Sequence, residues 1–274
     1  MSVHRGDSID TMDDLHLAIE AARAGGEIIR RFFGTPPNPD YKGKFDPVTA
    51  VDRASEEAIT ELIRTHRPDD EILAEEAGGE LTGGRHWIVD PLDGTVNFVH
   101  GIPHVSVSIA LYDGDRAVVG VVYDPMRDEL FSATDGGGTR LNGHHIAVSI
   151  EGELERSVIA TGFPYDHDEH ADELAVVVRE VLRRVNGIRR FGSAALDFAW
   201  VAAGRYEGYW ELGIAPWDGA AGLLLVREAG GTVTDPFGRA STPFMGLVVA
   251  SNAVIHDDLR TVIESWMPRR LIDP

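Results

Sequence analysis

The sequence contains no cysteine. This absence excludes disulfide-stabilised scaffolds, zinc sites built from thiolates and catalysis by a cysteine nucleophile. No uninterrupted apolar run approaches the roughly 18 residues that a membrane-spanning helix requires. The acidic stretch Met1–Asp14 lacks the basic start and the apolar segment of a signal peptide. We therefore expect a cytoplasmic protein that does not act at a membrane.

Lysine is also scarce, because it occurs only at Lys42 and Lys44 and all other cationic side chains apart from histidine are arginines. Lys and Arg together number 25 against 45 Asp and Glu, which gives a formal net charge of −20. Such a charge disfavours nucleic acids and anionic membranes as partners. An acidic surface with few lysines is typical of salt-tolerant proteins, but high-GC codon usage would also deplete lysine. The sequence favours neither explanation.

The length of the chain suits one large domain or two closely packed halves, since it has 274 residues. Apolar residues make up 43% and charged residues 26%, which is ordinary for a globular protein that buries a core. The halves meet near residue 150 without a linker rich in proline or serine. We expect an N-terminal metal- and phosphate-binding half over 1–150 and a C-terminal substrate-binding half over 151–274, packed as one unit.

The spacing of apolar residues predicts a mixed α/β chain. Steps of three and four residues predict helices over 14–33, 52–66, 174–185, 194–203, 217–229 and 255–266. Alternation and turn residues predict strands over 71–75, 86–90, 105–111, 117–123, 157–162, 188–191, 206–212 and 247–250. A rigid proline-rich loop is expected over 35–39, and Pro91 is expected to end the strand over 86–90.

The densest chemistry follows that apolar strand. Asp90 and Asp93 are three residues apart on a predicted strand-to-helix turn, so both carboxylates can face one point, with the Leu92 carbonyl between them. Oxygen ligands of this kind suit a hard divalent cation such as Mg²⁺. The free N–H groups of Gly94 and Thr95 would point at an anion such as phosphate. A metal beside a phosphate-binding turn is the outline of a phosphoryl-transfer site.

Further acidic residues stand at the ends of other predicted elements. Glu75 and Glu76 close an apolar strand, while Asp52 and Asp218 stand where helices are predicted to begin. Each has an ordinary explanation when taken alone, because glutamates at a strand end are usually solvated and an aspartate at a helix start usually caps the helix. A single one of these acids does not indicate a function, but their order along the chain does.

Together these segments resemble the inositol monophosphatase family, which represents the superfamily of Mg²⁺-dependent, lithium-sensitive sugar phosphatases. The resemblance extends from the first predicted helix nearly to the end of the chain and favours the bacterial inositol-1-monophosphatase branch. One departure is Ala74, where the family usually has glycine. The segments that carry the resemblance are Asp46-Pro47-Val48-Thr49 with Asp52, Glu75-Glu76, Asp90-Pro91-Leu92-Asp93-Gly94-Thr95 with Asn97-Phe98, Gly192-Ser193-Ala194-Ala195 and Trp217-Asp218 with Ala220-Ala221-Gly222 and Glu228-Ala229-Gly230-Gly231.

The resemblance implies a five-layer αβαβα sandwich with the active site between the two halves. It implies that Glu75, Asp90 and the Leu92 carbonyl hold a first Mg²⁺, and that Asp90, Asp93 and Asp218 hold a second. Two or three Mg²⁺ ions are expected in each active site. Two cations can clamp the attacking and the leaving oxygens of an in-line displacement.

The resemblance also assigns catalytic and substrate-binding roles. Thr95 and Asp52 match the pair that orients and deprotonates the attacking water, and Glu76 would position a water or help to hold a third metal. Glu211 matches the acid that accepts hydrogen bonds from sugar hydroxyls. Lys42 is expected near the phosphate, although a mobile solvated lysine is an equal alternative, and a surface ion pair is an equal alternative for Arg189. The expected substrate-binding residues are Asp93, Gly94, Thr95, Arg189, Gly192, Ser193, Ala194, Glu211 and Lys42.

The function that these residues imply is hydrolysis of inositol 1-phosphate and related polyol phosphates by a metal-dependent phosphomonoesterase. Fructose-1,6-bisphosphatase, histidinol-phosphatase and 3′-phosphoadenosine 5′-phosphate phosphatase activities share the same motifs and stay open. A regulatory protein that keeps the fold as an interaction module is a third possibility, but every metal-ligand position carries an acid, which argues against it. The resemblance further implies a homodimer.

Overall fold

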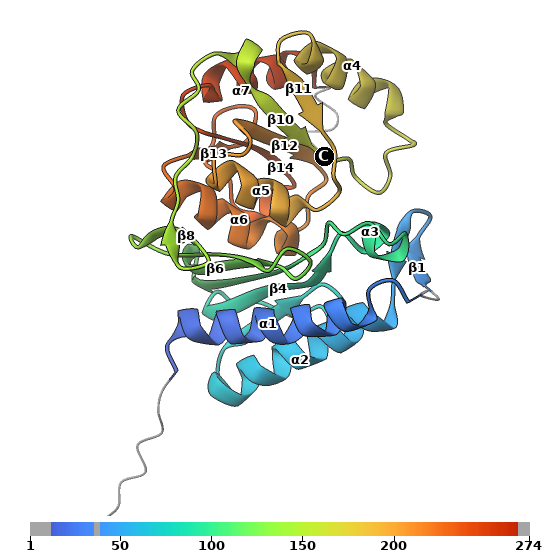
Figure 1. The fold of residues 1–274 in the computed structure, drawn as a ribbon, viewed down its shortest axis with the longest axis vertical. Helices are drawn as coiled ribbons and strands as arrows, with labels where there is room; N and C mark the ends of the chain where they lie inside the picture. The colour runs from blue at the N-terminus through green and yellow to red at the C-terminus, as the bar shows by residue number, and fades with distance from the viewer. Residues whose placement is uncertain (1–11, 36–38, 268–274) are drawn as a thin grey trace, which may run out of the picture.

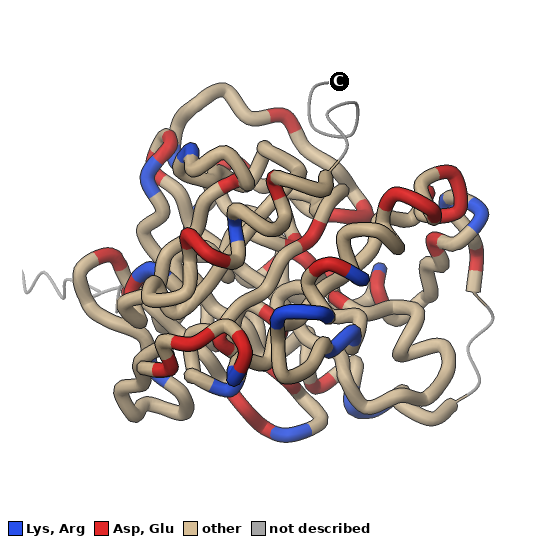
Figure 2. Tube along the Cα trace, turned by 90° about the horizontal axis from the view of Figure 1, so that it is seen from above, with Lys and Arg blue, Asp and Glu red and all other residues tan. Residues whose placement is uncertain are grey.

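The computed structural model describes residues 12–35 and 39–267. The N-terminal stretch examined for a signal peptide and most of the loop predicted over 35–39 lie outside the described residues. Among the residues described, no helix is long and apolar enough to cross a bilayer. Acidic residues occur along much of the described chain trace (Figure 2), and in the sequence they outnumber the basic ones.

Five layers of helices and sheets stack on one another (Figure 1). A pair of helices covers the outer face of a seven-stranded sheet, and a second pair lies between that sheet and a five-stranded sheet. A third pair covers the far face of the five-stranded sheet. This confirms the predicted αβαβα sandwich. From the outer N-terminal layer to the outer C-terminal layer, the helix pairs are α1 (Asp14–Phe32) with α2 (Ala50–His66), α5 (Ala194–Ala202) with α6 (Pro216–Glu228), and α4 (Ala171–Leu182) with α7 (His256–Trp266).

The seven-stranded sheet is a meander, with its strands in the order of the sequence. Only β3 and β4 pair in parallel, and each later neighbour is antiparallel. A separate hairpin, which the sequence analysis missed, is formed by β1 (Asp40–Gly43) and β2 (Asp46–Val48). The strands of the large sheet are β3 (Glu71–Ala74), β4 (Arg85–Asp93), β5 (Ser106–Asp113), β6 (Arg116–Asp124), β7 (Glu129–Thr134), β8 (Gly138–Leu141) and β9 (His144–His145).

The five-stranded sheet comes entirely from the second half of the chain and has the order β11-β10-β12-β14-β13. The division at residue 150 into two units stays a prediction, but each sheet draws its strands from one side of it. A short helix, α3 (Thr95–Val99), follows β4. The strands of the smaller sheet are β10 (Val158–Thr161), β11 (Gly187–Arg189), β12 (Gly208–Leu212), β13 (Thr232–Thr234) and β14 (Leu247–Ser251).

Three apolar cores hold the layers together. The central core joins the two halves, because Phe131 of β7 packs in the same buried cluster as Phe198 of α5 and Leu224 of α6. The outer cores bury α1 and α2 against one sheet and α4 and α7 against the other. Side-chain burial of this extent is the main favourable term in folding. The central core therefore fixes how the two halves face each other, and the site lies where they meet.

Two helix starts and one strand end differ from the prediction. Helix α2 is capped by Thr49, and Asp52 is its third residue, with a carboxylate that accepts the Thr49 N–H at 2.8 Å. Asp218 is likewise the third residue of α6, behind Ala215. Pro91 does not end β4, because a register shift against β5 accommodates the residue that lacks an N–H.

Candidate active site

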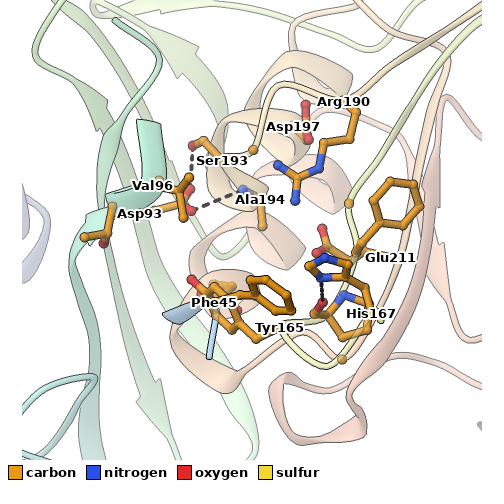
Figure 3. Close-up of a pocket in the computed structure, with 18 residues that line it drawn as sticks. Phe45, Asp93, Val96, Tyr165, His167, Arg190, Ser193, Ala194, Asp197 and Glu211 are labelled. Carbon is orange, nitrogen blue, oxygen red and sulfur yellow. Dashed lines mark hydrogen bonds between the residues drawn. The ribbon is translucent and has the colours of Figure 1, made fainter. Parts of the chain in front are cut away.

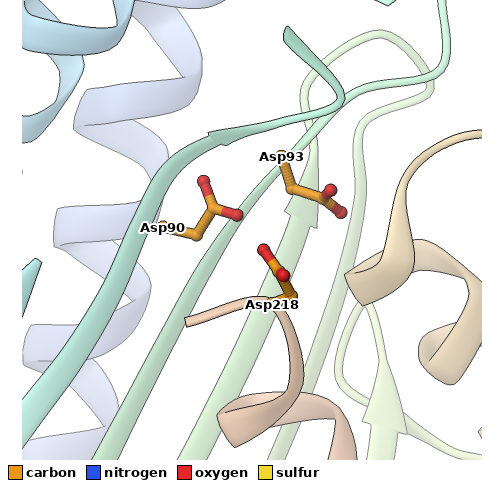
Figure 4. A group of neighbouring side chains, drawn as sticks. All are labelled: Asp90, Asp93 and Asp218. Atoms are coloured by element: carbon orange, nitrogen blue, oxygen red, sulfur yellow. The ribbon is translucent and has the colours of Figure 1, made fainter. Parts of the chain in front are cut away.

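Three carboxylates from two layers point toward one another (Figure 4). Asp90 and Asp93 are delivered by the end of β4, and Asp218 by the first turn of α6. One oxygen of each lies within 4.8 Å of one oxygen of each of the others. An arrangement of acidic oxygens at this spacing can hold a metal ion. The irregular end of β4 and the start of α6 therefore create a candidate metal centre between the halves.

The electrostatics of this centre are those of crowded buried acids. Asp90 is only 1% exposed, and burial together with Glu75, Asp93 and Asp218 raises its pKa well above the ordinary range. Burial and the neighbouring Asp93 likewise raise the pKa of Asp218, and burial raises that of Glu75 to about 7. Buried like charges are unfavourable unless a counter-charge is present. The set thus fits a divalent cation, whose charge would compensate the carboxylates.

Asp93 is the most strongly held of the three. Its Oδ2 accepts hydrogen bonds from the Ser193 hydroxyl, from the Ala195 N–H at 2.9 Å and from the Ser106 hydroxyl at 3.2 Å. The Ala194 N–H lies 3.3 Å from Oδ1. Ser193 and Ala194 were predicted to face the substrate, and here they fix Asp93 to the start of α5. They reach across the two halves and orient the carboxylate.

Glu75 and Glu76 lie beside this cluster and form ion pairs with the same lysine. Lys42 Nζ, on the β1–β2 hairpin, is 3.0 Å from Glu75 Oε1 and 2.5 Å from Glu76 Oε1. Lys42 is therefore not free in solution, which was the alternative to its proposed place near the phosphate. The backbone N–H groups of Glu76 and Ala77 donate to Glu56 at 2.8 and 2.9 Å, so Glu56, absent from the prediction, anchors this strand end.

A hydroxyl and a carboxylate lie next to the metal centre. Thr95 Oγ1 is 2.9 Å from Asp52 Oδ1 and 3.0 Å from the Leu92 carbonyl oxygen, and its single proton can be donated to either. Thr95 begins α3 behind Gly94, whose φ of 91° is left-handed and favours glycine. Asp52 is fully buried, and burial raises its pKa. The turn thus presents Thr95 to the cluster with an acid behind it.

The candidate metal centre opens into two adjoining cavities of about 320 and 270 Å³. Asp93, Gly94, Thr95 and Asp218 line both of them. The second cavity extends away from the cluster to Glu211 on β12 (Figure 3). The Glu211 carboxylate accepts a hydrogen bond from the Tyr209 hydroxyl, and burial raises the pKa of Glu211 to about 7. A long cavity with acids at both ends can hold a phosphate at one end and hydroxyl groups at the other.

Arg189 was predicted to line the substrate cavity, but the next residue along the chain lines it instead. Both arginines are exposed, but Arg189, on β11, donates to the Ile188 carbonyl, whereas Arg190, the next residue, lines the cavity. Successive side chains of an extended segment point to opposite sides, which is why a shift of one residue changes the face. Arg189 thus lines neither cavity, and its charge pairs with no acid in the described part of the chain, so its role in substrate binding stays a prediction.

Most predicted site residues do come together, although their roles stay predictions. Asp46 joins Lys42 and Glu75 beside the cluster, and Gly192 lines the longer cavity. The sequence analysis also missed Tyr165 and Asp197, for which no motif stood out. The predicted residues that line one or both cavities are Lys42, Glu75, Asp90, Leu92, Asp93, Gly94, Thr95, Gly192, Ser193, Ala194, Glu211 and Asp218.

Comparison with known proteins agrees with this geometry. The family model described as the inositol monophosphatase family matches residues 11–266. The chain belongs to the inositol monophosphatase family. Family membership covers both halves, so the two cavities lie within the matched region.

Relatives within the inositol monophosphatase family carry two names. The chain is 45% identical to the Nus factor SuhB of Escherichia coli, over 87% of this chain and 91% of that protein. It is 43% identical to the inositol-1-monophosphatase of Rhizobium meliloti, over 93% and 98% of the two chains. The structure of the inositol monophosphatase from Anabaena superposes with a TM-score of 0.85 at 41% identity, covering 93% of this chain and 96% of that one.

Proposed function

We propose that this protein is a Mg²⁺-dependent phosphomonoesterase that hydrolyses inositol 1-phosphate and related polyol phosphates. The observation that carries the proposal is the position of Asp90, Asp93 and Asp218 around one point at the mouth of a cavity that ends at Glu211. Membership of the inositol monophosphatase family, which matches nearly the whole chain, supports the same reaction. The alcohol leaving group would occupy the cavity, with its phosphate at the acidic cluster.

The acids divide between two metal positions. Glu75, Asp90 and the Leu92 carbonyl would hold one Mg²⁺, while Asp90, Asp93 and Asp218 would hold a second. Glu76, close to Glu75, would position a water or help to hold a third ion. When bound, the cations polarise the phosphoryl oxygens and make a nearby water more acidic.

The chain itself supplies the path for the proton of the attacking water. Thr95 Oγ1 can accept a proton from a water beside it while donating its own to Asp52 at 2.9 Å. Asp52 suits this role because burial favours its protonated form, so it can retain the proton it receives. Asp52 is in turn oriented by two hydrogen bonds from Thr49, at 2.8 Å from the N–H and 2.5 Å from the hydroxyl. Thr95 and Asp52 thus act as a relay to a buried base.

Different residues along the cavity would bind the phosphate and the leaving group of the substrate. Gly94 and Thr95 would offer backbone N–H groups to the phosphate at the start of α3, and Lys42 would release its ion pairs to balance the phosphate charge. Glu211 would accept hydrogen bonds from hydroxyl groups of the leaving group. Gly162 makes room for the Glu211 carboxylate, because a Cβ at position 162 would lie 1.9 Å from Glu211 Oε2. Only a glycine allows the carboxylate to reach the cavity here.

Release of inorganic phosphate from inositol 1-phosphate tests the proposal. We expect turnover with Mg²⁺, complete loss with excess EDTA and recovery when Mg²⁺ is restored. Millimolar lithium should inhibit, as the family resemblance implies. Full turnover in excess EDTA would contradict the metal-dependent mechanism, and absence of phosphate release from every ester tried would contradict phosphatase activity.

The sibling specificities are compared in the same assay. Fructose 1,6-bisphosphate, histidinol phosphate and 3′-phosphoadenosine 5′-phosphate should each give a lower kcat/KM than inositol 1-phosphate. A higher value for one of them would replace the proposed substrate without changing the chemistry, because the catalytic end of the site is common to all four.

A regulatory role is the second candidate, and it draws on the name Nus factor SuhB that several relatives carry. An interaction role needs no intact metal centre. A pull-down from extract should therefore recover the same proteins with the wild type and with Asp93→Asn if this role is the main one. We favour the enzyme, since all four proposed acidic ligands are present and buried or nearly so.

We also propose a homodimer, as the family resemblance implies. A surface near the cavity would suit it, because Phe191, which follows the cavity residue Arg190, is 41% exposed and its ring lies 6.1 Å from that of the half-buried Trp200. Light scattering after size exclusion should give twice the mass of the chain, which is 29.8 kDa. Phe191→Ser should then shift the protein toward the monomer. A wild-type protein with the mass of one chain would contradict the dimer.

A further inference from the structure

The end of the second cavity away from the acidic cluster contains a carboxyl group that none of the roles above uses. Asp197, on the first turn of α5, lines the cavity and is 1% exposed. Its Oδ1 is buried and has no hydrogen-bond partner within the described part of the chain. A buried carboxylate oxygen without a donor is unfavourable, so a ligand group that donates a hydrogen bond to it would be favoured here.

Arg190 faces Asp197 from the other side of the same end. In Figure 3 its guanidinium extends into the cavity between Asp197 and Glu211, and its charge acts on both carboxyl groups. The guanidinium lies 5.7 Å from the centroid of the Phe163 ring, and Arg190 is partly open to solvent. Its N–H donors can therefore reach a ligand in the cavity that Arg190 lines.

Donors and acceptors alternate at this end of the cavity. Asp197 and Glu211 offer carboxylate oxygens, and Arg190 offers N–H donors between them. A hydroxyl group both donates and accepts, so two neighbouring hydroxyls can donate to the acids and accept from the arginine. Burial raises the pKa of Asp197, as it does that of Glu211, so the acids tend toward their neutral forms. A second phosphate would meet two acids and one arginine, whereas an uncharged polyol would meet matching groups.

We infer that Asp197 and Arg190 form a hydroxyl-binding subsite beside Glu211, which restricts the substrate to phosphomonoesters of uncharged polyols with adjacent hydroxyl groups. This inference rests on the proposed phosphatase function. It names the part of the site that separates inositol-like substrates from bisphosphates. Asp197 is then a specificity-determining residue and takes no part in the attack on phosphorus.

The test compares two esters of which only one brings hydroxyl groups to the far end of the cavity. Because their leaving groups also differ in acidity, the ratio for each variant is compared with that of the wild type. Inositol 1-phosphate has ring hydroxyls, while p-nitrophenyl phosphate has none. For Asp197→Asn, and separately for Arg190→Met, the ratio of kcat/KM for inositol 1-phosphate to that for p-nitrophenyl phosphate should fall about tenfold to a hundredfold. The double variant should lose less than the product of the two single effects, because both residues bind the same hydroxyl pair.

Asp235→Asn is the matched control. Asp235 is equally buried, but its carboxylate accepts N–H groups of Phe237 and Arg239 and lies outside the cavities. Its substitution should lower the melting temperature and leave the ratio within twofold. Asp197→Asn should instead keep or raise the melting temperature, because it removes a buried carboxylate that has no partner. If Asp197→Asn does not fold, Arg190→Met carries the test alone.

A measurement without turnover completes the design. Free myo-inositol at tens of millimolar should raise the melting temperature of the metal-free wild type more than that of Asp197→Asn. Equal losses on both esters, or equal protection by myo-inositol, would overturn the subsite while leaving the phosphatase intact. A wild type that prefers fructose 1,6-bisphosphate would overturn the uncharged substrate class. A wild type that hydrolyses neither ester would overturn the proposed function, and the inference with it.

Discussion

Thr95 Oγ1 lies 2.9 Å from Asp52 Oδ1, although 43 positions separate the two residues in the chain. The hydrogen bond joins the first turn of α3 to the first turn of α2. Asp52 is completely buried, and its carboxylate faces Thr49 as well as Thr95. The hydroxyl of Thr95 is therefore the one group that connects this buried acid to the cavity, among the contacts formed by the described residues.

Removing the Thr95 hydroxyl should break the proposed proton path. Thr95→Val keeps the shape of the side chain, and kcat for inositol 1-phosphate should fall about a hundredfold or more. Thr95→Ser keeps the hydroxyl and should restore most of the rate. Thr49→Val removes the other hydroxyl bonded to Asp52, and should lower the melting temperature with a smaller loss of kcat. Thr95→Val with kcat within tenfold of the wild type would argue for a capping role only.

Asp93→Asn removes a negative ligand and keeps its size. Turnover should fall at least about a thousandfold, which corresponds to roughly 4 kcal/mol in the activation free energy. The metal-free melting temperature should not fall, because one of several repelling buried acids is lost. Asp113→Asn, at the exposed end of β5, is the control and should change neither quantity. Unfolding of Asp93→Asn would show that Asp93 serves the fold, through its bonds to α5.

The stability of the metal-free protein should depend on pH through Glu75. Burial raises the pKa of its carboxyl from 4.5 to about 7 in the folded state. Between these values the folded chain holds a proton that the unfolded chain releases, so this contribution to stability is present below about pH 4.5 and is lost as the pH rises through about 7. The melting temperature without metal should therefore fall between pH 5 and 8, and saturating Mg²⁺ should oppose that fall.

Glu75→Gln isolates this contribution. Its melting temperature should vary less with pH than that of the wild type, since the variant has no proton to lose at this position. Glu71→Gln is the control, because Glu71 begins β3, the strand that ends just before Glu75, and accepts a hydrogen bond from the Thr82 N–H at the surface. A slope that is identical in the wild type and Glu75→Gln would assign the pH dependence to other acids.

Glu211→Gln should change substrate preference more than metal dependence. An amide can accept a hydroxyl proton only through its single oxygen, so it replaces the carboxylate in part. The efficiency with inositol 1-phosphate should fall relative to that with p-nitrophenyl phosphate, while the Mg²⁺ concentration for half-maximal rate should stay close to that of the wild type. An unchanged ratio of the two efficiencies would remove Glu211 from the substrate wall.

The net charge of −20 predicts that salt stabilises the metal-free protein. The Debye length falls from about 30 Å at 0.01 M salt to about 3 Å at 1 M, so repulsion between surface acids is screened. The melting temperature should rise over this range of KCl. A further rise at 2–3 M would indicate an acidic surface adapted to high salt. A flat or falling curve without metal would leave codon usage as the reason for the scarcity of lysine.

Local patterns in the sequence were sufficient to predict most elements and the positions of the acidic ligands. Apolar spacing determines α1 and the strands of the meander, because a one-sided face has to be buried wherever it lies. The string from Asp90 to Thr95 contains its own strand end and helix start, so the sequence alone determines that Asp90 and Asp93 sit together. The five-layer fold followed from resemblance, and the structure confirms it.

Only the tertiary structure decided what surrounds those acids. The capping of α2 by Thr49 in place of Asp52, and the choice of Arg190 over Arg189 for the cavity wall, each depend on a shift of at most a few residues. A shift of that size changes the face on which a side chain lies. The unpartnered carboxylate of Asp197 has no signal in the sequence at all, because its burial arises from α5 packing between two sheets that come from different halves of the chain.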